Sequence, residues 1–311
     1  PTFVENVDSN FVGMTVAIIT SLLWAFGALI FTSAGKRLGS FNVSVYRLLV
    51  ATALLAVSNL LFLGNLFPVA TSEQWLWVGL SGILSLGIGD LALLNSFVVI
   101  GPKLSLIVYS SAPVFAAVGA YFMFGETVRP FGLIGIAITL VGISLAIWWK
   151  DESEVNDVSQ KSKTRGLLLA LIGAFGQGIG AVLSKKGMLS DPNTALNTLS
   201  ASFMRIAIGA LFLLLVAFAC RRMSTLKQAL RDRDGLKQTV IGAFIAVFIG
   251  GTLSMVALAN TQAGIAQTLM SLVPILIIPV AWILYREKIY LRGALGAVVA
   301  VIGIAVLFLA P

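Results

Sequence analysis

The sequence contains no histidine, a single cysteine and few charged residues, and each shortage excludes a class of protein. Histidine is the commonest metal ligand and the usual general base, so its absence argues against metal sites and Ser-His or Cys-His chemistry. The one cysteine, Cys220, allows no internal disulfide. Charged residues make up 11% of the 311 residues, against about 25% in a soluble protein. We therefore expect neither a soluble protein nor an enzyme, and no cofactor or metal.

Hydrophobic residues, by contrast, make up 58% of the chain, and the mean hydropathy is +0.99. They gather in runs of about 20 residues, the length at which a helix crosses the hydrocarbon core of a bilayer. The runs predict an all-α polytopic membrane protein with ten transmembrane helices, at residues 11–34, 42–63, 75–97, 103–124, 130–149, 166–187, 195–219, 237–258, 264–285 and 291–310.

The net charge of +8 does not predict nucleic-acid binding, because the basic residues lie mostly in short loops where they set topology. Loops that follow odd-numbered spans hold 16 Lys and Arg residues, and the other loops and termini hold three. Because cytoplasmic loops carry the excess of Lys and Arg, this count predicts that both termini lie outside the cytoplasm.

The chain divides into two halves of five spans each, residues 1–149 and 166–311, joined by a polar linker at 150–165. An offset of 161 residues relates the halves at several positions: Gly89 and Gly250, Pro113 and Pro274, Glu126 and Glu287, Gly132 and Gly293, Gly135 and Gly296, and Gly142 and Gly303. Near the start of each half the offset is 149, as for Lys36 and Lys185. Five is an odd number, so the second copy enters the membrane from the opposite side, and we expect an inverted repeat.

Five short motifs of the first half resemble those of a known family of membrane proteins. They are Trp24-Ala25-Phe26-Gly27, Gly89-Asp90, Ile100-Gly101-Pro102, Pro113 and Gly125-Glu126. Together with the duplicated five-helix unit, they resemble the drug/metabolite transporter superfamily, EamA type. The resemblance implies a ten-helix carrier of amino acids, other metabolites, nucleotide sugars or phosphorylated sugars. It also implies cytoplasmic termini, in disagreement with the charge count. The second half has Gly250-Gly251 in place of Gly-Asp and Arg286-Glu287 in place of Gly-Glu, so whatever Asp90 does is done once.

Asp90 is the one carboxylate well inside a predicted span. A charged residue at this depth is costly in lipid and normally faces a cavity or a partner. Two interpretations stay open: Asp90 pairs with Arg47 or Lys103, or burial lets it carry a coupling proton. Arg205, deeper in its span than its counterpart Arg47, is the better candidate to bind a carboxylate or phosphate on the cargo by two parallel hydrogen bonds. For both arginines, helix-to-helix bonding is the competing interpretation.

Pro113 and Pro274 lie within spans four and nine, where each removes a backbone hydrogen bond and frees the carbonyl four residues earlier. Such breaks are tolerated in a membrane only where protein or a cavity satisfies the freed groups. Polar residues cluster around both prolines, and we predict that they form facing walls of one midplane site: Tyr109, Ser110, Gln267 and Ser271.

Further candidate cargo contacts are Gln177, Asn95 and Trp24, which are polar or aromatic side chains at depth. Glu126 and Glu287 end spans four and nine, and we interpret them as hinge or cap residues that bond to backbone N–H groups of the following helix. Lys185 and Lys186 close span six and are interpreted as interfacial anchors, with screening of anionic cargo at the mouth of the site as the alternative.

These residues predict a secondary transporter, an exporter or exchanger of small polar metabolites such as amino acids, working by alternating access in a bacterial plasma (inner) membrane. No Walker-type phosphate loop is present, so the energy would come from protons or a cargo gradient. Its partners would be the lipid bilayer and a small-molecule substrate. The alternatives are a flippase for lipid head groups or lipid-linked substrates, and a nucleotide-sugar or organic-phosphate exchanger. A membrane-embedded enzyme would need a pair of acid and base groups that the spans lack.

Overall fold

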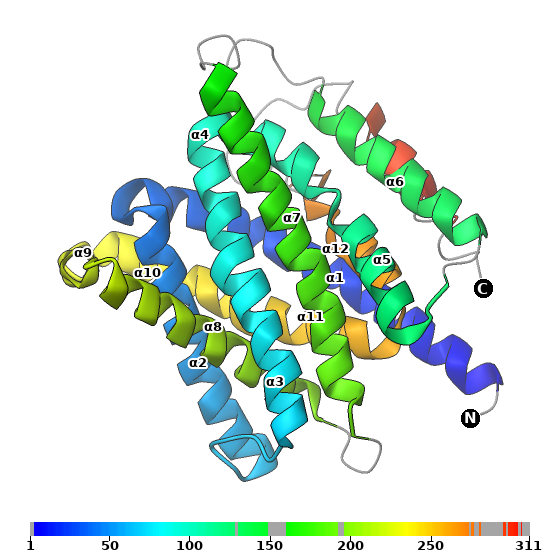
Figure 1. Ribbon diagram of the computed structural model, residues 1–311, viewed down its shortest axis with the longest axis horizontal. Helices are drawn as coiled ribbons and strands as arrows, with labels where there is room; N and C mark the ends of the chain where they lie inside the picture. The colour runs from blue at the N-terminus through cyan, green and yellow to red at the C-terminus, as the bar shows by residue number, and fades with distance from the viewer. Residues whose placement is uncertain are drawn as a thin grey trace.

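The computed structural model describes residues 3–127, 130–148, 160–191 and 196–273, with 275–276, 280, 295–296, 298–303 and 306 near the C-terminus. The described residues form helices joined by short turns (Figure 1). Six helical segments are long and apolar enough to cross a membrane: Ser9–Leu38, Ser40–Leu63, Ser72–Ser96, Lys163–Leu189, Thr198–Ala219 and Arg233–Asn260. Two shorter apolar helices cover Ala112–Phe124 and Pro130–Gly142. This is the construction of a multi-pass membrane protein.

The first half contains α1 (Phe3–Leu38), α2 (Ser40–Leu63), α3 (Ser72–Ser81), η1 (Gly82–Gly89), α4 (Asp90–Tyr109), α5 (Ala112–Phe124) and α6 (Pro130–Trp148). The second half contains α7 (Gln160–Leu189), α8 (Thr198–Ala219), α9 (Met223–Ala229), α10 (Arg233–Gly242), η3 (Ala243–Ile249), α11 (Gly250–Asn260) and α12 (Ala263–Met270). The segments η1 and η3 are π-helical and continue the helices on either side of them. The short helix α9 lies in what the sequence predicted to be a loop.

The boundary between predicted spans three and four lies inside α4, which is helical from Asp90 to Tyr109. The hydroxyls of Ser96 and Ser105 are nevertheless only 2.6 Å apart. Nine residues of straight α-helix would separate them by about 13.5 Å along the axis. The chain therefore turns back between them, where Gly101 and Pro102 lie. Proline accounts for such a kink because it removes a backbone hydrogen bond and crowds the preceding turn.

Each half places its first helix against the other half. The helix α7 packs along α3, η1, α4 and α5 of the first half, and α1 packs along α10, η3, α11 and α12 of the second (Figure 1). Gly27 of α1 lies against Ala246 in η3, and its repeat equivalent Gly176 of α7 lies against Leu84 in η1. Glycine at both positions lets the helix backbones approach closely. The two halves therefore share one core.

The 161-residue offset also relates structural features. The segment η1 begins at Gly82 and η3 begins at Ala243. The turn that follows α4 holds Ser110 and Ser111, and the turn that follows α12 holds Ser271 and Leu272. The backbone bond from Ser111 N to Val108 O recurs as the bond from Leu272 N to Leu269 O. The two helix breaks are thus built in the same way.

The small residues of α6 meet the C-terminal segment that lies beside it (Figure 1). A methyl group added to Gly142 would fall 2.8 Å from the backbone oxygen of Gly296, and one added to Gly303 would fall 2.9 Å from that of Gly135. The two repeat-equivalent glycine stripes therefore pack on each other. Gly293, the remaining member of the second stripe, lies outside the described residues.

Candidate functional site

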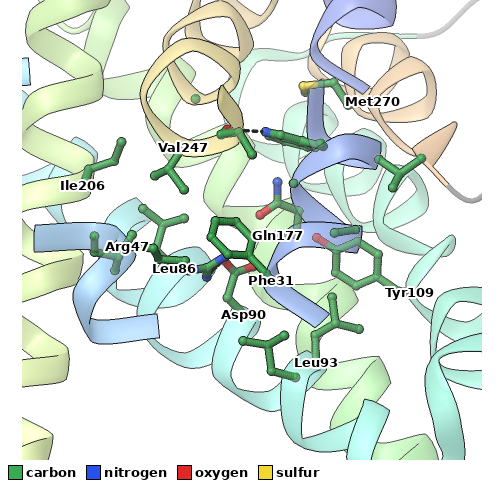
Figure 2. Close-up of a pocket in the computed structure, with 18 of the residues that line it drawn as sticks. Phe31, Arg47, Leu86, Asp90, Leu93, Tyr109, Gln177, Ile206, Val247 and Met270 are labelled. Carbon is green, nitrogen blue, oxygen red and sulfur yellow. Dashed lines mark hydrogen bonds and ion pairs between the residues drawn. The ribbon is translucent and has the colours of Figure 1, made fainter. Parts of the chain in front are cut away.

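Helices from both halves enclose a cavity of about 180 Å³. Its walls come from α1, α2, α4, α7, α8, α11 and α12, and from both π-helical segments. Figure 2 shows side chains from these elements converging on it. Nine of the site residues predicted from the sequence line this cavity: Trp24, Arg47, Asp90, Tyr109, Ser110, Gln177, Arg205, Gln267 and Ser271.

Asp90 forms an ion pair with Arg47 of α2 (Figure 2). The side chain of Arg47 is 10% exposed, and that of Asp90 is 19% exposed. The guanidinium of Arg47 also lies over the ring of Phe31, 5.3 Å from its centroid. Of the two partners predicted for Asp90, Arg47 is the one that the structure shows. Its side chain is buried within the helix bundle. The Arg47–Asp90 pair is neutral overall.

Arg205 of α8 is the second buried arginine of the cavity. Its Nη2 donates a hydrogen bond to Ser85 Oγ in η1, at 2.7 Å. Its Nε has no hydrogen-bond partner within the described residues, and no carboxylate there pairs with it. Ser85 is neutral and Asp90 is already paired with Arg47, so no described carboxylate forms an ion pair with Arg205, and the described residues that line the cavity carry one net positive charge.

The polar residues around the two helix breaks meet at the cavity. Tyr109 and Ser110 come from the end of α4, and Gln267 and Ser271 come from α12 and the turn after it. Ser271 Oγ donates to the backbone oxygen of Gln267 at 2.8 Å, so this hydroxyl bonds to its own helix. The side-chain oxygen of Gln267 is buried and has no partner among the described residues. The cavity thus offers a hydrogen-bond acceptor as well as positive charge.

Trp24 and Gln177 come from the first helix of each half. The indole Nε1 of Trp24 donates to the backbone oxygen of Ala246 in η3 at 3.1 Å. This bond fixes the ring as a wall of the cavity. The rest of the lining is mainly apolar and includes Phe31, Leu48, Leu86, Leu93, Leu94, Ile206, Val247 and Met270.

Three predicted site residues of the described chain, Asn95, Pro113 and Glu126, do not line the cavity. Asn95 is exposed, and its amide donates to the backbone oxygen of Leu91 on its own helix at 2.8 Å. Pro113 lies in the first turn of α5, where helices tolerate proline because that N–H has no partner within the helix. The expected break is therefore made two residues earlier, at the Ser110–Ser111 turn. Pro274 and Glu287, the predicted counterparts in the second half, lie outside the described residues.

Glu126 bonds to a different helix from the one predicted. Its Oε1 lies 2.6 Å from Nζ of Lys185 in α7, and its Oε2 accepts from the backbone N–H of Ala263, the first residue of α12, at 3.2 Å. Lys185 also donates to the backbone oxygen of Thr261 at 2.8 Å. Lys185 is buried, so the prediction of an interfacial anchor at this position is wrong.

Three polar or aromatic residues that line the cavity were not predicted from the sequence: Phe31, Thr32 and Ser202. Ser85, which accepts a hydrogen bond from Arg205, was not predicted either. Ser202 precedes Arg205 by three residues, so both lie on one face of α8. Ser85 lies among glycines five residues before Asp90, and a small hydroxyl inside an otherwise apolar run was an available signal. In the described part of the chain, no three Asp, Glu or Cys side chains gather as metal ligands would.

Comparison with known proteins places these features in a family. The profile of the EamA-like transporter family matches residues 11–148 and again residues 164–309. One solved crystal structure superimposes with a TM-score of 0.74 at 17% sequence identity, covering 96% of this chain and 97% of the other. At that identity, the likeness shows a shared fold alone. No curated protein matches the sequence significantly.

Proposed function

The chain belongs to the EamA-like transporter family, and we propose that it is a secondary active transporter that exports or exchanges small polar metabolites such as amino acids. It works by alternating access of the cavity between ten transmembrane helices arranged as two inverted repeats. Its place is the plasma (inner) membrane of a bacterium. The duplicated match to one family profile and the recurrence of the π-helical segments at the 161-residue offset support this arrangement.

The observation that carries the proposal is that Arg205 is buried and forms no ion pair with any carboxylate among the described residues. A buried guanidinium whose one described side-chain partner is a neutral hydroxyl is costly unless a ligand supplies the missing negative charge. Guanidinium groups bind carboxylate and phosphate by parallel hydrogen bonds. A cargo that carries a carboxylate beside a small apolar or polar body would satisfy Arg205 and fill the mixed lining of the cavity.

An exchanger of organic phosphates is the second candidate. The net positive charge of the cavity favours it, since a phosphate is recognised by the same guanidinium chemistry. The small volume of the cavity, about 180 Å³, favours a short cargo over a nucleotide sugar in this conformation.

The test is uptake into proteoliposomes that contain the purified protein. A mixture of amino acids, small organic acids, sugar phosphates and nucleotide sugars is offered, and the contents are read by mass spectrometry against empty liposomes. Selective accumulation of carboxylates supports the main proposal, and accumulation of phosphates supports the second. No accumulation under any imposed proton or cargo gradient, from protein with a cooperative melting transition, contradicts both.

Variants of Arg205 sharpen the test. Hydrogen bonds to charged groups are worth about 1.5–3 kcal/mol, so Arg205→Gln should reduce transport at limiting cargo by about tenfold or more. Arg205→Lys should retain part of the activity because it keeps the charge but loses the two-pronged geometry. Arg165→Gln is the matched control, since this arginine is exposed and is not among the residues that line the cavity.

A further inference from the structure

The segment between the helices α8 and α10 carries an unusual concentration of positive charge. Six basic residues fall within residues 221–237, and all six are exposed: Arg221, Arg222, Lys227, Arg231, Arg233 and Lys237. Within the part of the chain that the structure describes, none of the six pairs with a carboxylate. No carboxylate of the described residues therefore balances these six charges.

The two acidic residues of the same segment are already occupied. Asp232 accepts three hydrogen bonds from Arg37 and one from the backbone N–H of Gly235, by which it caps α10. Asp234 lies 3.4 Å from Arg37. Arg37 belongs to α1, so both acidic side chains of the segment pair with a residue from elsewhere, and the six basic residues together with Arg37 exceed the two carboxylates by five charges.

The short helix α9 within this segment is held against the N-terminal end of α2. The hydroxyl of Tyr46 donates to the backbone oxygen of Leu226 at 2.7 Å, and the guanidinium of Arg222 lies over the ring of Phe41 at 5.3 Å. Leu226 and Ala229 are the buried residues of α9 itself. The helix is therefore a fixed part of the surface, at the edge of the bundle in Figure 1.

The outer face of α9 mixes apolar and basic side chains. Met223 and Leu230 are 40% and 54% exposed, and Lys227 lies between them on the same face, because the three are spaced by four and three residues. The apolar surface continues on both sides, to Phe218 at the end of α8 and to Val240 of α10. We call residues 221–237 the α9 surface. It lies between the exposed apolar residues of α8 and α10 and carries the exposed basic side chains.

We propose that the α9 surface is a binding site for the anionic head groups of phospholipids in the adjacent leaflet. Amphipathic helices with basic residues and exposed apolar side chains lie in the membrane interface, and clusters of four to eight Lys and Arg beside a spanning helix attract anionic lipids. The lysine and arginine stems lie along the apolar surface while their charges reach the phosphates. This inference does not depend on what the protein transports.

The natural single cysteine provides the test. Cys220 is exposed and directly precedes Arg221. The purified protein is labelled there with a fluorophore and reconstituted in bilayers of phosphatidylcholine with about one fifth phosphatidylglycerol, with brominated chains on one lipid or the other. We expect brominated phosphatidylglycerol to quench at least about twofold more than its share of the bilayer predicts, because each basic residue at a head group favours an anionic lipid by about fivefold.

A variant with Lys227→Gln, Arg231→Gln and Arg233→Gln should lose this preference, and so should the unaltered protein in molar salt. The control carries Lys163→Gln and Arg165→Gln at the start of α7, outside the α9 surface, and should keep the preference. Equal quenching by the two lipids, or a preference that survives the triple substitution, would overturn the proposal. If the basic residues served only to set topology during insertion, they would have no further role in the bilayer. Equal quenching, or a preference that survives the triple substitution, would then be the result.

Discussion

Glu126 and Lys185 form a buried ion pair, with Oε1 2.6 Å from Nζ, that joins the end of α5 to α7. Through the Ala263 N–H and the Thr261 carbonyl, the same two side chains also hold the junction between α11 and α12. Four helices are thus tied together at one point, and by chain order that point lies at the end of the bundle opposite to the Arg37–Asp232 pair.

Removing one partner of this pair should destabilise the protein strongly. Glu126→Gln leaves the Lys185 ammonium buried without its counter-charge, and breaking a buried pair costs about 3–5 kcal/mol. We expect a clearly lower melting temperature in detergent, measured by tryptophan or dye fluorescence. The double variant Glu126→Gln with Lys185→Met should melt above Glu126→Gln alone. Glu73→Gln, at an exposed glutamate bonded to Trp77, is the control and should change little. Equal melting of all variants would contradict the prediction.

Asp90→Asn should separate cargo binding from energy coupling. The substitution keeps the size of the side chain but removes the charge that balances Arg47. If Asp90 carries the coupling proton, the variant exchanges cargo across the membrane but no longer accumulates it in response to a pH gradient. The measurement compares gradient-driven uptake with cargo exchange in the same proteoliposomes. Gradient dependence that persists in Asp90→Asn would show that the residue serves only its pair with Arg47.

Gly82→Ala should destabilise the contact between η1 and α8. A methyl group at Gly82 would collide with the backbone oxygen of Arg205, which cannot move without displacing α8. Overpacking of this kind costs about 1–3 kcal/mol, and it would also shift Arg205 in the cavity. The control is Gly35→Ala in α1, where nothing lies within 4 Å and alanine is the better helix former. Thermal melting of the two variants in opposite directions is the expected result.

The Arg37–Asp232 pair predicts a dependence of stability on acid pH. Hydrogen bonds from Arg37 and from the Gly235 N–H lower the pKa of Asp232 below its ordinary value. A carboxylate with a depressed pKa contributes its stabilisation above the unfolded pKa and loses it as the pH falls through the folded one. Melting temperatures measured from pH 6 down to pH 3 should therefore fall less steeply in Asp232→Asn, which starts lower, than in the unaltered protein. Parallel curves would contradict this account.

The sequence alone determined the membrane character of the chain and much of its site. Apolar runs must become helices in lipid because every backbone polar group there needs a partner within the protein, so composition and run length predict the spans. Arg205, Gln267 and Tyr109 were predicted for the same reason, since a polar side chain at depth has to face a cavity or a partner. Within the described residues, the 161-residue spacing read from glycines and prolines also matched the spacing of the two helix breaks.

The tertiary structure decided what local sequence does not encode. The choice of Arg47 as the partner of Asp90, the outward position of Asn95 and the bond of Glu126 to Lys185 depend on which helices become neighbours. Which helices are neighbours follows from the packing of α1 against the second half and of α7 against the first. Glycines make this packing possible, because they let helices that are distant in the sequence approach closely. Hydropathy fixes how deep a residue lies in the membrane, whereas the direction in which it points is set by packing between helices.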